Sequence, residues 1–204
     1  MDKINHSYID ESVIINGNVK IYPNVFLCGD TVIEDGTIIY PNTFIENSKI
    51  GKNCVIKSSF IESSVIENDV QIGPFSHLRP NCLIESHCKI GNFVEVKNSH
   101  LKEGTKASHL AYIGDAEVGK NCNIGCGAIF VNYNGKSKSK TNVGDNCFIG
   151  SNCNIIAPVN IAKNSYICAG TTLTIDTENA DFVIGRCRET IKKNRAKNYL
   201  KEIF

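Results

Sequence analysis

Two cations, one histidine and one acidic residue in the middle of the chain are of types that bind anions and move protons. Arg79 and Lys97 are eighteen residues apart, and Glu95 and His109 lie in the same stretch. Fixed cationic side chains recognise phosphate groups well. A histidine with a carboxylate partner is the usual composition of a general base near neutral pH. These residues predict a site that binds a phosphorylated ligand and holds a base beside it.

An aliphatic residue recurs at every sixth position over most of the chain, and this period indicates the elements that position the site. Its first uninterrupted run is Ile9, Ile15, Ile21, Leu27, Ile33, Ile39 and Ile45. Two positions before each lies a small or β-branched residue, and three positions after many lies Asn, Asp or Gly, which tolerate positive φ. One short strand and one corner every six residues predict an all-β fold, a parallel β-helix of hexapeptide repeats.

The spacing of Arg79 and Lys97 matters because one coil of such a helix contains about eighteen residues. Residues one coil apart lie above each other at the ~4.8 Å spacing of neighbouring strands. Two cations at that distance repel each other unless an anion lies between them. The alternative is that both side chains extend into water. By the same arithmetic, His109 comes near Glu95.

Two segments depart from the period. We expect a β-helix domain over 1–175, with an extruded basic loop at 131–142, VNYNGKSKSKTN, where an Asn-Gly turn and three lysines interrupt it. A solvated insertion without function is the alternative. The remaining segment, 176–204, is a basic tail whose composition predicts a short helix. This helix either caps the open end of the solenoid or supplies cations to a ligand.

Composition narrows the function classes. The net charge of +1, with mixed signs, gives no indication of nucleic-acid or membrane binding. No apolar run is long enough to span a bilayer and no signal peptide follows Met1, so we expect a cytoplasmic location. Most of the ten cysteines occupy inward small positions and none forms a CxxC pair, which favours reduced structural thiols over zinc sites or disulfides.

Four stretches carry a more specific signal than the repeat. They are GNFVEVKNS (91–99), GTKASHLAYIGDAEVGKNCNIGCGAIFVNYNG (104–135), FIGSNCNIIAPV (148–159) and CAGTTLT (168–174). They resemble the carboxy-terminal acetyltransferase domain of the bacterial bifunctional enzyme that joins glucosamine-1-phosphate acetyltransferase to N-acetylglucosamine-1-phosphate uridylyltransferase.

The resemblance implies a left-handed β-helix, a handedness that the period alone does not give. It also implies a homotrimer with active sites between subunits and a loop that reaches a neighbour. The implied reaction is acetyl transfer from acetyl-CoA to the amine of glucosamine-1-phosphate, a step toward UDP-N-acetylglucosamine and the cell envelope.

The resemblance also implies roles for individual residues. His109 matches the general base, and Glu95 matches a nearby acidic residue that we expect to orient it. The matches to sugar and phosphate contacts are Arg79, Lys97, Tyr112, Asn123, Asn132 and Lys138. The matches to positions that line the acetyl-CoA groove are Cys126, Tyr133, Ser151, Ala169 and Arg186.

Three departures from the family pattern stand out. Asn134 replaces the usual aspartate of Asn-Tyr-Asp-Gly, and Cys126 occupies a position where a small residue is common. The glycine-rich phosphate loop of the nucleotidyltransferase half is absent, so we expect no uridylyl transfer from these residues.

We expect direct attack of the substrate amine on the thioester, with backbone N–H groups near 125–127 or 150–151 binding the oxyanion and no metal required. A covalent route through Cys126 is disfavoured because no base is evident beside it. Three alternatives remain. They are a metalloenzyme, which needs three convergent imidazoles, a non-catalytic trimeric scaffold, and an acetyltransferase for a different amino sugar.

Overall fold

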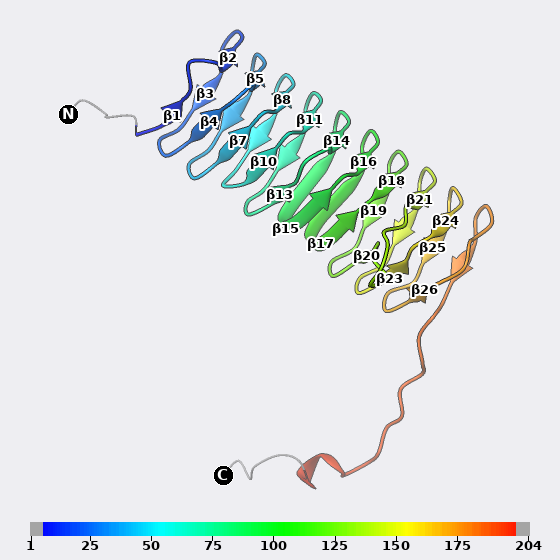
Figure 1. The fold of residues 1–204 in the computed structure, drawn as a ribbon. Helices are drawn as coiled ribbons and strands as arrows, with labels where there is room; N and C mark the ends of the chain where they lie inside the picture. Colours follow the sequence, from blue (N-terminus) through cyan, green and yellow to red (C-terminus); the bar gives the residue numbers. More distant parts are fainter. Residues whose placement is uncertain (1–5, 199–204) are drawn as a thin grey trace.

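The hexapeptide period builds a straight stack of coils. The computed structural model describes residues 6–198, in which each coil contributes short strands separated by tight corners (Figure 1). The strand-to-strand pairings are parallel and join each strand to its counterpart in the next coil, for example Tyr8 with Phe26 and Phe26 with Phe44. The predicted fold class, a left-handed parallel β-helix of hexapeptide repeats, is confirmed.

The strands form three walls. The first wall contains β1 (Tyr8–Ile9), β4 (Phe26–Cys28), β7 (Phe44–Glu46), β10 (Phe60–Glu62), β13 (His77–Leu78), β20 (Ile129–Val131), β23 (Asn154–Ile156) and β26 (Thr172–Leu173). The second contains β3 (Lys20–Ile21), β6 (Ile38–Ile39), β9 (Val55–Ile56), β12 (Gln71–Ile72), β19 (Asn123–Ile124), β22 (Phe148–Ile149), β25 (Tyr166–Ile167) and β27 (Phe182–Val183). The third contains β2 (Ile14–Ile15), β5 (Val32–Ile33), β8 (Lys49–Ile50), β11 (Val65–Ile66), β14 (Leu83–Ile84), β16 (His100–Leu101), β18 (Ala116–Val118), β21 (Thr141–Val143) and β24 (Val159–Ile161).

Two long strands, β15 (Lys89–Lys97) and β17 (Lys106–Gly114), continue around the corner between the second and first walls. They pair with each other along most of their length, from Lys89 with Lys106 to Lys97 with Gly114. They therefore join the two walls into one 18-stranded sheet, while the third wall is a separate 9-stranded sheet. The predicted base and most of the predicted acceptor contacts lie on or next to this long pair.

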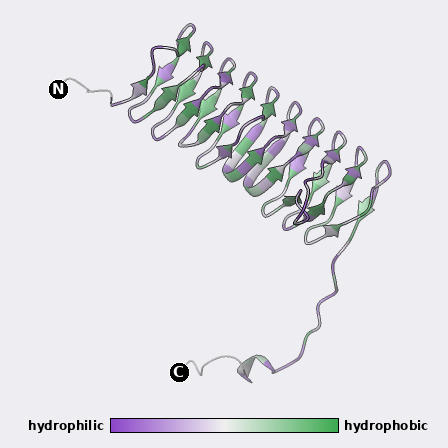
Figure 2. Ribbon diagram, viewed as in Figure 1, coloured by the Kyte–Doolittle hydropathy of each residue, from purple (hydrophilic) through white to green (hydrophobic). Residues whose placement is uncertain are grey.

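The core is the inside of the stack, where the sixth-position aliphatic residues lie. From Leu27 onward these side chains are at most 4 % exposed, whereas Ile9 and Ile15 at the open N-terminal end are 40 % and 39 % exposed. Threonine, serine and cysteine fill the small inward positions, and burial raises the pKa of Cys54 and of Cys88 to about 11. In Figure 2 the strands are mostly hydrophobic and the corners mostly hydrophilic.

Most of the predicted corner residues, such as Asn24, Asn42 and Asn53, adopt positive φ. At two N-terminal corners the left-handed residue is instead a glycine one position earlier, Gly17 or Gly29. Glycine adopts this region without the steric cost that a Cβ imposes, so it takes the corner where it is available.

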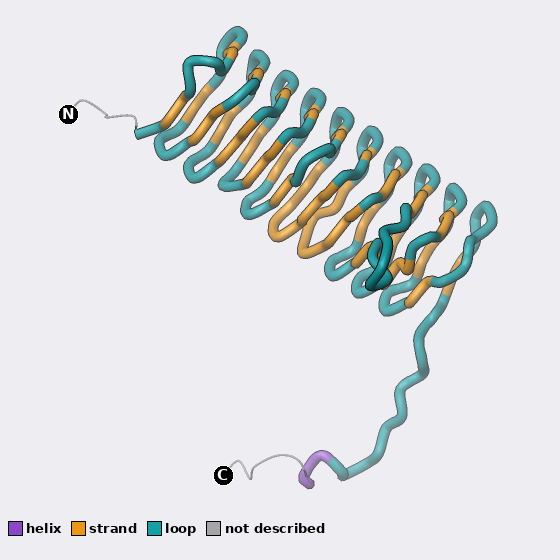
Figure 3. The backbone as a smooth tube through the Cα atoms, in the orientation of Figure 1, coloured by secondary structure: helices purple, strands orange, loops and turns teal. Residues whose placement is uncertain are grey.

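The chain leaves the first wall between β20 and β21. β20 ends at Val131 and β21 begins at Thr141, and the intervening chain leaves the wall, as the teal tube in front of the coils shows (Figure 3). An antiparallel bridge between Tyr133 and Lys138 closes it into a narrow hairpin.

The tail differs from the prediction of a short helix. β27 adds one more strand by pairing with β25, and beyond it the chain runs away from the stack in an extended form (Figure 1). The one helical segment described is a 3-10 turn, η1 (Ala196–Asn198). Side chains such as that of Ile191, which is 82 % exposed, find no wall to pack against within this chain, and most helix stability comes from such packing. The rest of the predicted helix, 199–204, lies outside the described residues. No helix among residues 6–198 has the length and apolar character needed to cross a membrane.

Candidate active site

Three cations gather where the first wall meets the extruded loop. The backbone N–H of Arg79 donates to the carbonyl of Val96 at 2.8 Å, which places Arg79 beside Lys97 in the next coil as the spacing predicts. Lys138 of the loop lies close enough to lower the pKa of Lys97, and burial and Arg79 lower it further. Like charges lower the pKa of a lysine because they destabilise its protonated form, and a bound anion relieves this repulsion. The arrangement can therefore bind a phosphate group.

Two carboxylates border this cation cluster of Arg79, Lys97 and Lys138. Glu95 accepts a hydrogen bond from Arg79 Nη1 at 3.1 Å, an ion pair in which both side chains are partly exposed. Asp115 opposes the lowering of the Lys97 pKa by the other cations. The cluster keeps an excess of positive charge despite these two groups.

His109 lies on β17 where the strand rounds the corner. Its partner in β15 is Asn92, and the Nδ1 of His109 lies 2.7 Å from the amide oxygen of Asn92. An amide oxygen only accepts hydrogen bonds, so Nδ1 carries the proton and Nε2 of the neutral ring has its lone pair available. The imidazole is exposed, and in this tautomer it can act as a base toward a ligand in solvent.

The partner of His109 is a correction to our expectation. Glu95, which we expected to orient the imidazole, pairs in register with Tyr112 and forms its ion pair with Arg79. Asn92 takes the orienting position instead, seventeen residues before His109. That separation, one residue short of a full coil, is the sequence signal that identifies Asn92.

Asn132 connects the wall to the loop. It is 8 % exposed, and its amide donates to the hydroxyl of Tyr112 at 3.4 Å and to a carboxylate oxygen of Asp115 at 2.5 Å. Burial alone would raise the pKa of Asp115, but hydrogen bonds from Asn98 and Asn132 outweigh it and the pKa is lowered. The structure thus brings together five of the six predicted acceptor contacts, namely Arg79, Lys97, Tyr112, Asn132 and Lys138.

Asn123, the sixth, lies apart from them. It is part of β19 on the second wall and pairs with Lys106 and Phe148, whereas Arg79 follows β13 on the first wall. The corner that carries His109 lies between these walls.

A groove of about 450 Å³ follows the first wall next to this corner, lined by Phe93, Glu95, Leu110, Ala111, Tyr112, Gly127, Ile129 and Asn152.

The predicted cofactor positions form a column at one corner. Cys126 is exposed, and its carbonyl accepts from Asn152, while the carbonyl of Ser151 accepts from Gly170 in the next coil. This register stacks Cys126, Ser151 and Ala169 one above another. Arg186 joins the column, because its Nη1 donates to the carbonyl of Ala169 at 2.9 Å. Tyr133 lies away from it in the loop, with its hydroxyl bonded to Gly135.

Two glycines keep this column closely packed. A Cβ on Gly125 would lie 2.6 Å from the backbone of Gly150, and one on Gly150 would lie 2.4 Å from the backbone of Ala169. With no side chain at these positions, successive corners stack backbone on backbone. An extended ligand can lie along such a closely packed edge.

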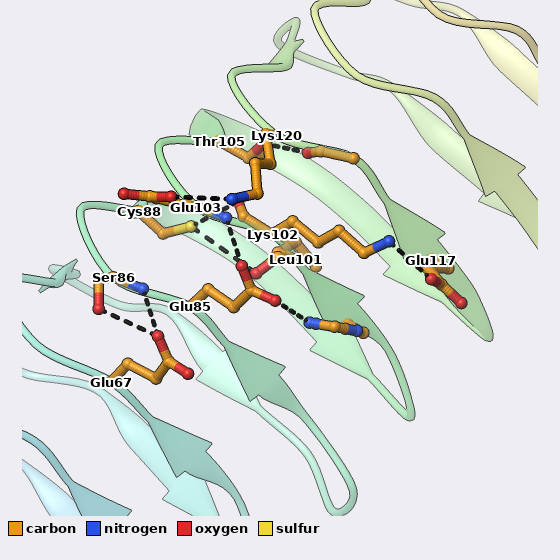
Figure 4. A network of polar contacts seen from close by, with 12 residues as sticks. Glu67, Glu85, Ser86, Cys88, Leu101, Lys102, Glu103, Thr105, Glu117 and Lys120 are labelled. Carbon is orange, nitrogen blue, oxygen red and sulfur yellow. Dashed lines mark hydrogen bonds and ion pairs between the residues drawn. The ribbon is translucent and has the colours of Figure 1, made fainter.

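A different ionic network covers the third wall (Figure 4). Glu117 accepts from Lys102 at 2.9 Å and from the loop lysine Lys140 at 3.1 Å, while Lys120 pairs with Glu103 at 3.1 Å. His100 bonds to Glu85 at 2.7 Å, as an ordinary histidine–carboxylate contact. Among residues 6–198, no three or more His, Cys, Asp and Glu side chains are grouped so that they could hold a metal ion.

The coil period and parallel walls define a hexapeptide-repeat β-helix protein. Two family models match parts of the chain, namely bacterial transferase hexapeptide (six repeats) over 63–98 and hexapeptide repeat of succinyl-transferase over 140–174. Among solved structures, a UDP-N-acetylglucosamine acyltransferase from Arabidopsis has a TM-score of 0.61 over 86 % of this chain and 68 % of its own. At 15 % identity this likeness shows the fold alone.

The particular resemblance is to bifunctional GlmU proteins. The one from Caldicellulosiruptor saccharolyticus is 50 % identical over 187 residues, 92 % of this chain and 40 % of the relative. Those from Clostridium kluyveri and Clostridioides difficile are 46 % and 48 % identical, over 93 % of this chain and 42 % and 41 % of theirs. The chain thus spans about two fifths of the length of these relatives. The resemblance to the acetyltransferase domain of the bifunctional enzyme, inferred from the motifs, is confirmed.

Proposed function

We propose that the chain transfers the acetyl group of acetyl-CoA to the amine of glucosamine-1-phosphate, giving N-acetylglucosamine-1-phosphate and free coenzyme A. The cation cluster of Arg79, Lys97 and Lys138 is the observation that supports this most directly. It fits a phosphorylated acceptor, and it lies next to the Tyr112–Asn132 contact, which offers polar atoms to a sugar.

The mechanism follows from the positions of the groups. The cation cluster would anchor the phosphate and so hold the amine close to the thioester. Nε2 of His109 would remove a proton from the amine as its nitrogen attacks the thioester carbonyl carbon. When the carbon–sulfur bond breaks, the coenzyme A thiolate takes up a proton and the amide product remains. Asn92 keeps the ring in the tautomer that accepts at Nε2.

The cosubstrate would lie along the column of Cys126, Ser151 and Ala169. The pantetheine arm can lie along these closely packed corners, and Arg186 would offer a cation to the phosphates. The backbone N–H groups of the same corners are candidates for binding the oxyanion of the tetrahedral intermediate. Cys126 has no base bonded to it among the described residues, so direct transfer is favoured over a thiol intermediate.

A homotrimer with active sites between subunits accounts for the two separated sets of residues. Arg79 and Asn123 lie on different walls of one chain, and a neighbouring copy packed against the His109 corner would bring its own wall to the site. In this arrangement each site would combine residues of two copies around one histidine.

Acetylation measured by product mass tests the function. Turnover with glucosamine-1-phosphate and acetyl-CoA, and much less with unphosphorylated glucosamine, would support both the reaction and the phosphate site. Turnover with another amino sugar phosphate, but none with glucosamine-1-phosphate, would assign the chain to a different acceptor. A folded trimer that acetylates no amino sugar would favour the scaffold alternative.

A further inference from the structure

Asp115 carries a charge at a corner where the backbone has no need of one. The preceding coils place Asn81 and Asn98 at this corner, with φ of 66° and 45°, and Asp115 follows them with φ of 49°. Asparagine is at least as suited to the left-handed region as aspartate. The geometry of the corner therefore does not explain the carboxylate, and its contacts must.

The contacts of Asp115 hold both ends of the extruded loop. Its carboxylate accepts from Asn132, just after β20, and from Asn98 in the coil before. Its backbone carbonyl accepts from the N–H of Thr141, the first residue of β21, at 3.1 Å. Its own N–H donates to the carbonyl of Lys97 at 3.0 Å. One residue thus links the start of the loop, the end of the loop and the wall lysine of the cation cluster.

The charge of Asp115 also acts on the cluster itself. Lys138 and Arg79 lower the pKa of Lys97, whereas the carboxylate of Asp115 raises it. Glu95, the other carboxylate at the cluster, is paired with Arg79. Lys138 and Lys97 in turn help keep Asp115 ionised. Without a negative group beside the base of the loop, Lys138 would be repelled from the wall.

We propose that Asp115 is a positioning residue, which holds the loop 131–142 against the wall so that Lys138 shares one anion site with Lys97 and Arg79. The proposal rests on the proposed function, because it deepens the account of how the phosphate of the acceptor is bound. It does not place Asp115 in contact with the substrate.

The variant Asp115→Asn isolates this role, because asparagine already occupies the same corner in the two preceding coils and the variant is therefore expected to fold. An asparagine has one acceptor oxygen for the two amide donors, and it carries no charge. We expect the KM for glucosamine-1-phosphate to rise about tenfold, since hydrogen bonds to charged groups are strong, while the KM for acetyl-CoA changes less than about twofold. Glu103→Gln, a carboxylate removed from the third-wall network, is the matched control.

Two further readouts separate positioning from a general structural role. Removing the anion lowers the pKa of Lys97 further, so the rise of the sugar-phosphate KM at alkaline pH should begin at lower pH in Asp115→Asn. In a Lys138→Ala background, Asp115→Asn should have less than half of its effect on the KM for the sugar phosphate, because the lysine that Asp115 positions is absent.

Calorimetric titration with inorganic phosphate makes the test independent of turnover. Weaker phosphate binding by Asp115→Asn than by wild type would support the proposal even if glucosamine-1-phosphate proved not to be the acceptor. Equal phosphate affinity and unchanged sugar-phosphate KM would overturn it, as would full additivity with Lys138→Ala. If the variant melted early, Asp115→Glu keeps the charge but shifts the carboxylate; an unchanged sugar-phosphate KM in that folded variant would also contradict the proposal.

Discussion

The imidazole of His109 donates its Nδ1 hydrogen to the side-chain oxygen of Asn92, 2.7 Å away, and the two residues face each other across β15 and β17. A neutral partner fixes the tautomer without adding a negative charge beside the ring. A carboxylate partner would instead favour the protonated imidazolium.

Replacing Asn92 by aspartate tests this relationship. A carboxylate that replaces the amide facing Nδ1 favours the protonated imidazolium, so the acid limb of the kcat profile should move to higher pH. The measurement is the pH profile of kcat for wild type and Asn92→Asp. If the acid limb lies at the same pH in both proteins, the group whose protonation it reflects is not His109.

Removing the imidazole tests the base itself. His109→Ala should lower kcat by about 10²–10⁴-fold, the usual contribution of general base catalysis. The side chain is exposed, so its loss should leave the melting temperature within about 1 °C of wild type. Activity retained at more than about a tenth of wild type would remove His109 from the mechanism.

Lys97→Ala tests phosphate anchoring. It takes away one cation of the cluster, so the KM for the sugar phosphate should rise at least about tenfold, with a much smaller change for acetyl-CoA. Lys120→Ala, which removes a partly exposed lysine from the third-wall network, is the control and should change neither constant. Equal increases for both substrates in Lys97→Ala would argue against a phosphate site there.

Glu117 gives a pH dependence of stability. Hydrogen bonds from Lys102 and Lys140 lower its pKa to about 2, so its stabilising effect is present above the ordinary value of 4.5 and is lost as pH falls toward 2. Because its side chain is 38 % exposed, Glu117→Gln should cost only about 1 kcal/mol at pH 7. Urea unfolding of both proteins should show this difference at pH 7 and a smaller one at pH 3. A difference of the same size at both values would contradict the ion-pair explanation.

Gly91 tests how closely the long strands must pack. A Cβ there would lie 1.9 Å from the carbonyl oxygen of Ser108, so Gly91→Ala must push β15 and β17 apart next to Asn92 and His109. We expect a loss of about 2 kcal/mol or more and a fall in kcat together. Gly135→Ala is a useful comparison, because nothing lies within 4 Å of its added Cβ and only its positive φ opposes the change. Full activity of Gly91→Ala would mean that the strands adjust without moving the imidazole.

The period was sufficient to predict the fold, the buried face and the contact between Arg79 and Lys97, because each depends only on the number of residues in a coil. The partner of His109 depended on the length of one coil. The coil that joins it to Asn92 contains seventeen residues, whereas Glu95 precedes His109 by fourteen and pairs in register with Tyr112. Within residues 6–198 the side chain of Glu95 bonds to Arg79 and not to His109, because register decides such contacts.

The role of Asp115 was not predictable from the repeat. Its partners Asn132 and Thr141 lie at the two ends of an insertion whose path no period describes. The predicted helix of the tail differs from the structure for another reason. Its helix-forming composition is a weak preference, and the described tail residues after Arg186 are exposed and pack against no wall.

Because the coils stack uniformly, the axial separation of two residues depends on the number of coils between them. Arg79, Lys97 and His109 lie on three successive coils, so their separation along the axis of the stack is a whole number of strand spacings of ~4.8 Å each. Such a scaffold can change that axial separation only in whole steps, by moving a residue to the coil above or below. Ligands of different length are then distinguished by how many coils separate the groups that bind their two ends.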